Sequence, residues 1–585
     1  MKNLVCLLIA GLITLTACTS EKNGSLTDGS YKGVASGHNS NIEVEVSVAD
    51  GKLDSVKVVE HNETRGLGDK ALETMITLIN ENKSTNVDAV SAATITSFGV
   101  LNATRNALKE AGADDAYFKS ETKVAQNYAD LDSEYLYDVV VIGAGGAGLT
   151  AAIEAKAAGA KVAVIEKSSA TGGNTLVSGG GLNAPGTAQQ IAKGVEDSAE
   201  KFANDTFNSG DKEANYELVK VMADNAHDAT EWLINDINVE FLPDRLQQFG
   251  GHSVPRAIVP VGNHGDELIL KLEAAADKAG VDMFFNVKGE ELIMDEGRVK
   301  AVKASYNGEE IVFNAEKGVI IATGGFASNV EMRKQYNEAY GEKFKSTARQ
   351  NSTGDGIVMA ENIGAALTDM EFIQVYPTCN PLTGIISYVA NARFDGAVLV
   401  NAEGQRFVNE MGRRDEISHA ILNQTDEVGY LFWGQEVENI GHMTEMHAVE
   451  YQNWIDSGLL HKADTIEECA KFFNIDVETM TKTIEDYNAS CADGVDEDFN
   501  RSGSVRASLT APYYIQKVVP SSHHTMGGIV INSDAAVLDT NGNVIPGLFA
   551  AGEVTGDIHG TNRLGGNAIT DCVVFGRIAG QNVVK

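Results

Sequence analysis

Two short apolar runs enclose a glycine-rich turn near residue 140. Residues 139–142 and 162–165 are apolar runs of strand length, and the Ala-rich stretch that ends at Gly159 has helical character. Residues 143–148 between them read Gly-Ala-Gly-Gly-Ala-Gly, and Glu166 follows the second run directly. The pattern therefore predicts a strand, a glycine turn, a helix, a second strand and an acid, in that order.

This order is typical of a dinucleotide-binding unit. Glycines let backbone amides approach a pyrophosphate at the helix N-terminus, and the acid after the second strand can hold a ribose hydroxyl. The alternative is an ordinary βαβ unit whose turn happens to be rich in glycine.

Further glycine-rich segments narrow the cofactor to FAD. Residues 172–175 and 178–183 follow the acid closely, and residues 318–325 and 547–553 are strand patterns that run into glycines. From about Tyr137 to Lys585, these pieces resemble the fumarate reductase/succinate dehydrogenase flavoprotein family. The resemblance implies an α/β fold: a Rossmann-like FAD-binding domain with an inserted α+β capping domain, and FAD held non-covalently. The residues expected to contact FAD are Gly143, Gly145, Ala147, Gly148, Glu166, Asn174, Thr175, Gly180, Gly181, Val287, Asp355, His523, Glu553, Ala568 and Ile569.

Composition limits the alternatives. A chain of 585 residues is too long for a single core, so two to four domains are expected. The net charge of −36 argues against nucleic-acid binding and against attraction to anionic lipid. The six cysteines are scattered without a CxxC pair, which argues against a zinc site or a disulfide framework, and no metal is expected.

The first 18 residues have the pattern of an export signal. Lys2 precedes an apolar run from Leu4 to Leu15, and Leu15-Thr16-Ala17-Cys18 resembles a bacterial lipobox. Cleavage before Cys18 would leave a thiol for lipid attachment, which predicts a cell-membrane protein on the extracytoplasmic face, held only by a lipid anchor. A plain secretory signal is the alternative.

Residues 29–112 are expected to form a small α+β domain of their own. Residues 42–48 alternate apolar and polar positions, residues 50–51 are a turn pair, and residues 56–59 return as a second strand. The segment 88–97 then precedes a helical stretch.

That segment, Asp-Ala-Val-Ser-Ala-Ala-Thr-Ile-Thr-Ser over residues 88–97, resembles an FMN-binding domain. In that family a flavin transferase esterifies a threonine hydroxyl with the phosphate of FMN. By position the acceptor here is Thr94 and not Thr96, and Ala92 stands where the family usually has glycine. The alternative is a helix N-terminus that is capped by Ser and Thr, as in any protein.

The remaining boundaries follow from composition and from the resemblance. Residues 113–135 are polar and acidic and are expected to be a linker. Residues 136–370 and 523–585 would form the FAD-binding domain. Residues 371–522 would form the capping domain, which in the family closes over the substrate.

Arg414 is the expected proton donor. Residues 404–410, with the Arg413-Arg414-Asp415 triplet that follows, resemble the catalytic stretch of the family, in which the arginine before the aspartate donates the proton. Arginine is a poor acid, so the role requires a relay that reprotonates it, and Arg393 and Glu410 are the candidates. The alternative is a surface ion pair.

Two C-terminal segments, 521–528 and 560–567, match the substrate-holding parts of the family. The resemblance implies that His524 and Arg563 hold a carboxylate and that His523 lies against the flavin. Arginine suits this role because its planar fork meets a carboxylate bidentately. Ordinary core histidines are the alternative.

The chain departs from fumarate reductases at the other end of the substrate. Fumarate reductases carry His-Pro-Thr where this chain has Tyr376-Pro377-Thr378, and they add a Thr-Glu pair that is missing here. A tyrosine ring suits an aromatic group better than a second carboxylate. The stretch resembles urocanate reductases, although Asn391 stands where a carboxylate for the imidazole is expected, with Asp395 close by.

The combined interpretation is an exported reductase of an α,β-unsaturated carboxylate. Electrons from a membrane-side donor would pass from FMN to FAD and on to urocanate, giving imidazole propionate in anaerobic respiration. A fumarate reductase and a cinnamate-like acrylate reductase are the enzyme alternatives. A flavin electron-shuttle lipoprotein is the alternative that is not an enzyme.

Overall fold

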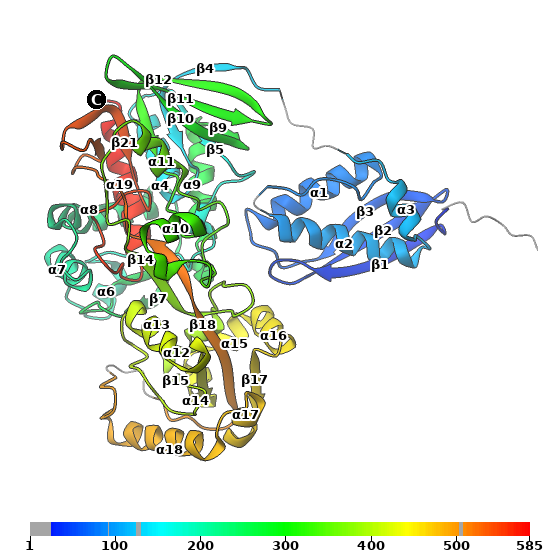
Figure 1. Cartoon of the computed structure of the whole chain (residues 1–585), viewed down its shortest axis with the longest axis vertical. Helices are drawn as coiled ribbons and strands as arrows, with labels where there is room; N and C mark the ends of the chain where they lie inside the picture. Colours follow the sequence, from blue (N-terminus) through cyan, green and yellow to red (C-terminus); the bar gives the residue numbers. More distant parts are fainter. Residues whose placement is uncertain (1–24, 92, 125–129, 502–506) are drawn as a thin grey trace, which may run out of the picture.

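The computed structural model describes residues 25–91, 93–124, 130–501 and 507–585 (Figure 1). A small N-terminal body, drawn in blue, lies beside a large α/β body, and a third body lies below the large one. The predicted export signal and the lipid-attachment residue Cys18 fall outside the described residues.

The N-terminal body is a three-stranded antiparallel sheet covered by two long helices. Strands β1 (Gly29–Ser36), β2 (Asn41–Ala49) and β3 (Lys52–Glu60) pair in sequence order. Helices α1 (Gly68–Asn82) and α2 (Thr94–Glu110) lie over the sheet. The predicted alternation is real, because every second residue of β2 from Ile42 to Val48 is buried.

The predicted linker, residues 113–135, holds more structure than its composition indicated. A short helix, α3 (Asp115–Ser120), forms within it. The Glu121 carboxylate then accepts hydrogen bonds from the backbone N–H and the hydroxyl of Thr85, at 2.8 and 2.6 Å. Polar side chains therefore fasten this segment to the N-terminal body, a long-range pairing that a scan for apolar residues does not detect.

The large body is built on a sheet of eight strands. Strands β12, β4, β5 and β9 are parallel neighbours, β21 runs parallel beside β12, and β10, β11 and β12 form an antiparallel meander. The strands are β4 (Glu134–Ile142), β5 (Val162–Glu166), β9 (Asp282–Phe285), β10 (Val287–Asp295), β11 (Arg298–Tyr306), β12 (Glu309–Ile321), β20 (Ala536–Leu538) and β21 (Val544–Ala550). Because β4 and β5 are buried among parallel neighbours, their sequences are apolar without alternation.

Helices cover this sheet, and α4 packs closely against the C-terminal helix α19. The helices of this body are α4 (Gly146–Ala157), α5 (Gly173–Leu176), α6 (Ala188–Ala192), α7 (Ala199–Ser209), α8 (Tyr216–Asn235), α9 (Asp266–Ala279), α10 (Val330–Tyr336), α11 (Asp355–Asn362) and α19 (Asn567–Asn582). A three-stranded sheet lies at one end, with β6 (Leu182–Asn183), β7 (Phe241–Gln247) and β8 (Ala257–Pro260).

The third body has its own hydrophobic core, which runs from Val389 to Val518. Its sheet is ordered β14-β18-β16-β15, with β17 beside β18. Its strands and main helices are β14 (Ile373–Cys379), β15 (Val398–Val400), β16 (Gly429–Gly434), β17 (Leu460–Ala463), β18 (Tyr513–Thr525), α12 (Ala392–Asp395), α13 (Arg414–Leu422), α14 (Gln435–Gly441), α15 (Met443–Met446), α16 (Ala448–Asp456), α17 (Ile466–Phe472) and α18 (Val477–Asp493).

One strand joins the two larger bodies. Figure 1 shows β18 running from the lower body into the upper one, where its last residues pair with β14. This strand carries His523 and His524 at its upper end. The junction of the two bodies is therefore the place where residues distant in sequence meet.

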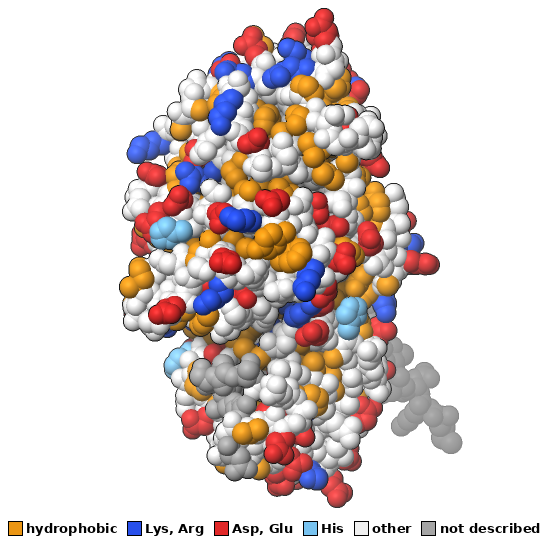
Figure 2. Space-filling view, turned by 90° about the vertical axis from the view of Figure 1, so that its left-hand side faces the viewer, with side chains coloured by type: hydrophobic (Ala, Val, Ile, Leu, Met, Phe, Trp, Pro, Cys, Tyr) orange, Lys and Arg blue, Asp and Glu red, His pale blue; other side chains and the backbone are white. Residues whose placement is uncertain are grey.

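The outer surface carries mixed charge. On the face drawn in Figure 2, Lys and Arg side chains are scattered among Asp and Glu side chains. No helix in the described part of the chain is long and apolar enough to span a bilayer.

Candidate active site

The glycine turn has the shape that its sequence predicts. A Cβ at Gly148 would lie only 1.9 Å from the carbonyl oxygen of Gly143, so no side chain fits where α4 leaves the sheet. At Gly145 the nearest atom to a Cβ would be 3.9 Å away, and this position faces a pocket. Gly148 permits close packing of the helix on the sheet, and Gly145 leaves the turn open to a ligand.

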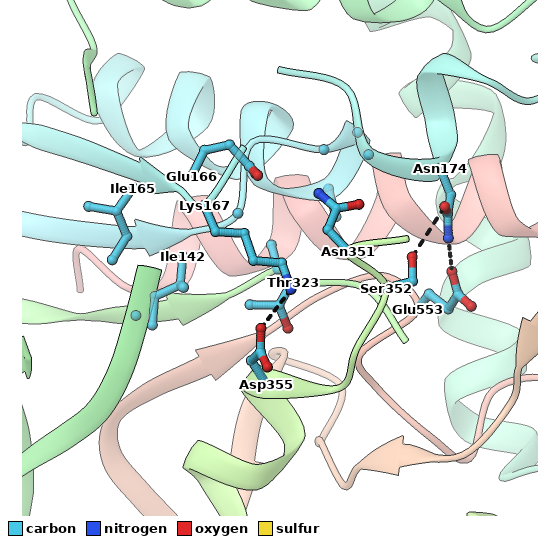
Figure 3. Close-up of a pocket in the computed structure, with 18 of the residues that line it drawn as sticks. Ile142, Ile165, Glu166, Lys167, Asn174, Thr323, Asn351, Ser352, Asp355 and Glu553 are labelled. Atoms are coloured by element: carbon cyan, nitrogen blue, oxygen red, sulfur yellow. Dashed lines mark hydrogen bonds and ion pairs between the residues drawn. The ribbon is translucent and has the colours of Figure 1, made fainter. Parts of the chain in front are cut away.

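That pocket lies at the carboxyl ends of the parallel strands and holds about 800 Å³, including its open mouth. Figure 3 shows side chains from several elements converging on it. The predicted FAD contacts that line it are Gly143, Gly145, Ala147, Glu166, Asn174, Thr175, Val287, Asp355 and Glu553. An elongated, glycine-floored cavity with an acid beside the helix N-terminus fits an FAD molecule.

The Glu166 carboxylate is held at the turn by backbone amides. It accepts from the N–H of Ala144 at 2.9 Å and from the N–H of Ser168 at 2.8 Å. At the other end of the pocket, the Asn174 side chain donates to Glu553 at 3.2 Å, and burial raises the pKa of Glu553. Both acids are thus fixed in place without blocking the cavity.

Six other predicted FAD contacts do not line this pocket: Gly148, Gly180, Gly181, His523, Ala568 and Ile569. Gly148 serves helix packing. A Cβ at Gly180 would lie 2.6 Å from Pro260, so Gly180 permits packing between segments of the chain. The last two residues lie in the first turn of α19.

The pocket also contains side chains that the sequence did not single out. Lys167 makes an ion pair with Asp355 at 2.6 Å and donates to Thr353 at 2.7 Å (Figure 3). Asn351 and Ser352 also line the pocket, and the Ser352 hydroxyl donates to Asn174 Oδ1 at 3.3 Å (Figure 3). Lys167 directly follows the acid, and that adjacency was the only available signal.

A second, smaller pocket lies where the two larger bodies meet. Its lining comes from four separate segments: Phe249, Gly250, Arg393, Phe394, Gly412, Arg414, Asn562, Arg563, Leu564 and Gly565. Three of the predicted site arginines therefore face one cavity of about 300 Å³. Only tertiary packing brings these segments together.

The side chains of the neighbours Arg413 and Arg414 point in different directions. Arg413 is the N-cap of α13 and makes ion pairs with Asp211 and Asp415, both at 2.7 Å. Arg414 points inward, with its Cζ 4.9 Å from the Tyr376 ring centroid. The surface ion pair considered from sequence thus belongs to Arg413.

Basic side chains in and beside this pocket are buried without anions. Arg414 Nη1, Arg563 Nε and both ring nitrogens of His524 have no hydrogen-bond partner within the described ranges. Burial, together with the charge of Arg414, lowers the pKa of Arg563 to about 9. Burial also lowers the pKa of Arg414, and it lowers the pKa of His524 well below its ordinary value. Unpaired buried charge is costly, so the arrangement is suited to a bound anion.

Tyr376 lies between the arginine and the histidine. It is buried on β14, and its ring is 5.1 Å from the His523 ring in an edge arrangement. The Thr347 hydroxyl is 2.6 Å from His523 Nδ1, which fixes the imidazole. Tyr376 does not line the small pocket directly, and it stands behind Arg414.

Two phenylalanines line the pocket together with the arginines. Phe249 and Phe394 meet edge to face, with ring centroids 6.0 Å apart. The guanidinium of Arg393 lies 4.4 Å from the Phe394 ring centroid. Asn391 is half-buried one turn before Phe394, and its side chain makes no hydrogen bond to another described residue. Sequence reasoning missed both phenylalanines, because isolated aromatic residues carry no motif.

The proposed relay needs a correction. The carboxylate of Glu410 is occupied by Arg406, at 2.9 Å, and by Arg501, at 3.1 Å. Arg393 reaches only the backbone carbonyl of Glu410, at 2.8 Å. The geometry therefore makes Glu410 a structural anchor of this segment and leaves Arg393 as the relay candidate that faces Arg414.

Thr94 is placed as a modification site requires. It is the first residue of α2 and is exposed, while Thr96 is buried and hydrogen-bonded to Glu63. No side chain caps the amides at this helix end, so they can receive a phosphate.

Comparison with known proteins identifies the class. The FAD-binding-domain family matches residues 138–569, and the FMN-binding-domain family matches residues 37–109. The chain belongs to the first family and carries the second domain before it. This confirms the predicted fold class and the predicted FAD- and FMN-binding domains.

The relatives define the chemistry further. A urocanate reductase of Eggerthella lenta is 42% identical over 98% of this chain and 96% of its own length. A fumarate reductase (cytochrome) of Shewanella frigidimarina is 40% identical over 80% of each chain. The open conformation of a flavocytochrome c3 fumarate reductase superposes with a TM-score of 0.65, at 38% identity, over 77% of this chain and 78% of that one. The chain is an FAD-dependent oxidoreductase that acts on carbon–carbon double bonds of unsaturated carboxylates.

Proposed function

We propose that the chain reduces an α,β-unsaturated carboxylate with an aromatic substituent, and that urocanate, reduced to imidazole propionate, is the preferred substrate. The observation that carries the proposal is the small pocket, which Arg414 and Arg563 line together with two phenylalanines, while Arg414 Nη1 and Arg563 Nε have no hydrogen-bond partner among the described residues. Dinucleotide-pocket residues such as Glu166 and Asn174 would hold FAD, which supplies the hydride when it is bound.

The side chains divide the remaining work. Arg563 and His524 hold the substrate carboxylate, on which negative charge develops as the double bond is attacked. His524 is neutral and offers one N–H, while Arg563 supplies the positive charge. Arg414 gives a proton to the second alkene carbon, and Arg393 reprotonates it. The phenylalanine pair exclude water from this site.

A cinnamate-like acid is the second candidate. Asn391 is uncharged, and the described residues that line the pocket include no carboxylate to pair with an imidazolium. A neutral aryl ring would meet the same phenylalanine surface without that requirement. Fumarate is disfavoured, because Tyr376 replaces a histidine that would hold its second carboxylate.

One panel separates these candidates. Urocanate, cinnamate and fumarate are offered to the purified holoenzyme with a reduced viologen dye, and kcat/KM is compared. The proposal expects both aryl acrylates to exceed fumarate, with urocanate first. A preference for fumarate would overturn it, and cinnamate ahead of urocanate would select the second candidate.

The electron route is part of the same proposal. FMN joined covalently to Thr94 by a transferase would receive electrons from a membrane-side donor and supply FAD, in a lipoprotein anchored through Cys18 for anaerobic respiration. Thr94→Ala should remove the flavin band from a denaturing gel and leave the non-covalent FAD. Thr96→Ala is the matched control, and a band that persists in Thr94→Ala would move the attachment site elsewhere.

A further inference from the structure

The N-terminal body touches the large body through charged and polar pairs. Arg65 lies 3.3 Å from Asp266, and Lys70 Nζ lies 2.7 Å from Glu273. Each pair joins the α1 region to helix α9. Surfaces that carry opposite charges at two neighbouring points define both position and orientation.

A third contact lies beside the flavin-attachment segment. The hydroxyl of Ser169 donates to the carbonyl of Ser91 at 2.8 Å. Ser91 is three residues before Thr94, and Ser169 is three residues after the ribose-binding candidate Glu166. The contact therefore connects the segment that would carry FMN to the loop that would hold FAD.

The same loop is reached through Glu273. One oxygen of this carboxylate meets Lys70, and the other accepts from the Thr171 hydroxyl at 3.0 Å. Thr171 precedes the glycine pair that opens α5, and α5 carries Asn174 in the FAD pocket. A single carboxylate thus links the N-terminal body to the wall of the dinucleotide pocket.

The backbone also approaches closely at this surface. A Cβ at Gly66 would lie 2.9 Å from Leu270 of α9 and 3.5 Å from Leu176, the last residue of α5. Apolar side chains near the attachment point remain uncovered, since Ile95 is 50% and Phe98 is 52% exposed. The polar pairs and the close approach of Gly66 to α9 therefore join the two bodies.

We propose that this surface is a docking site for the FMN-binding domain in cis, and that the docked arrangement is the one from which FAD receives electrons. The proposal rests on the electron route given under the proposed function. It assigns Lys70 and Glu273 as the central pair, with Arg65 and Asp266 as the second pair. Both cations are substantially exposed, so docking is reversible and weakens as salt rises.

Zero-length cross-linking tests the surface without any enzyme assay. A carbodiimide joins a lysine amine to a carboxylate as an amide, and the reagent itself takes up the water that is released. In the full holoenzyme at low salt, the expected product is a cross-linked peptide that contains Lys70 and Glu273, and its yield should fall at about 0.5 M salt. The Lys57–Glu45 pair, 2.9 Å apart within the small sheet, is the matched control.

Cross-linking of the control pair without any Lys70–Glu273 product would overturn the proposal. Thr94→Ala protein should give the same cross-link as the parent, because the surface does not need the flavin. Loss of the cross-link in that variant would mean that the flavin, and not these side chains, holds the FMN-binding domain on this surface.

Charge reversal tests the electron step. Overall, two electrons and two protons leave reduced FMN and reach FAD, and stopped-flow absorbance follows the second flavin. Lys70→Glu and Glu273→Lys should each slow this step about tenfold, and the double variant should restore it. Lys57→Glu, which makes the same charge change away from the surface, should leave the rate unchanged.

The outcomes distinguish this proposal from the proposed function. Excess reduced viologen reaches FAD directly, so both single variants should keep the turnover of the parent with that dye. If turnover with the viologen dye is intact but the single charge reversals do not slow the FMN-to-FAD step, the proposed docking surface alone is overturned. Loss of alkene reduction in the parent itself would count against the proposed function instead.

Discussion

The two pockets differ in which parts of the chain line them. The dinucleotide pocket is centred on the glycine turn of one βαβ unit, which contributes Gly145 and Glu166, and segments such as 287–289 and 322–324 complete its lining. The substrate pocket is made mainly of large side chains from four segments, among them Arg414 and Arg563. A site that is centred on a backbone turn can be predicted from local sequence, whereas a site made of side chains depends on the packing of the whole molecule.

They also differ in energy. The first pocket exposes amides that any βα turn would leave free, so it strains nothing when empty. The second gathers guanidinium groups away from water, and their lowered pKa values report the cost. A bound carboxylate would relieve this cost by pairing with the guanidinium groups. The same charge pairing would therefore supply both the binding energy and the specificity for an anionic substrate.

Removing Arg414 should have the largest effect on turnover. Arg414→Ala is expected to lower kcat by about 10³-fold, because the reaction loses its proton donor. FAD should still be reduced by dye and reoxidised by an artificial acceptor, which stopped-flow absorbance would show. Arg413→Ala is the matched control, since that neighbour makes surface ion pairs, and retained turnover in Arg414→Ala would refute the assignment.

A substitution in the dinucleotide pocket should lower stability and FAD content. In Gly148→Ala the new methyl would overlap the Gly143 carbonyl, which should destabilise the fold by about 1–3 kcal/mol and release FAD. Thermal unfolding and flavin fluorescence would measure both effects. Gly159→Ala, where the glycine has a positive φ but nothing within 4 Å of an added Cβ, separates steric overlap from backbone strain. Normal FAD content in Gly148→Ala would contradict this account of the turn.

Substrate affinity should depend on pH through Arg563. Its pKa of about 9 in the free protein means that it loses charge above that pH, while a bound carboxylate favours the charged form. Binding must then take up a proton, so KM should rise about tenfold per pH unit above pH 9 and stay level below it. A profile of log KM that stays flat to about pH 10 would show that Arg563 does not hold the anion.

Sequence alone could predict the first pocket far better than the second. The glycine turn and Glu166 follow from local periodicity, and they stand where that pattern puts them. Glu410 lies close to Arg414 in sequence, yet Arg501 captures its carboxylate from a distant segment. Phe249 enters the site from the loop that follows β7. No pattern within one segment contains such information, because packing between segments decides it.

The smallest expected effect concerns which acid is chosen. Tyr376 touches Arg414 but does not line the pocket, so its influence passes through that arginine and through any ring placed beside it. Tyr376→His would add a donor for a second carboxylate, and the ratio of kcat/KM for fumarate to that for urocanate should rise about tenfold. Tyr376→Phe keeps the ring and should leave the ratio within about fivefold of the parent, since one neutral hydrogen bond is worth about 1 kcal/mol. An unchanged ratio in Tyr376→His would mean that selectivity is set by Phe249 and Phe394, which line the side-chain pocket.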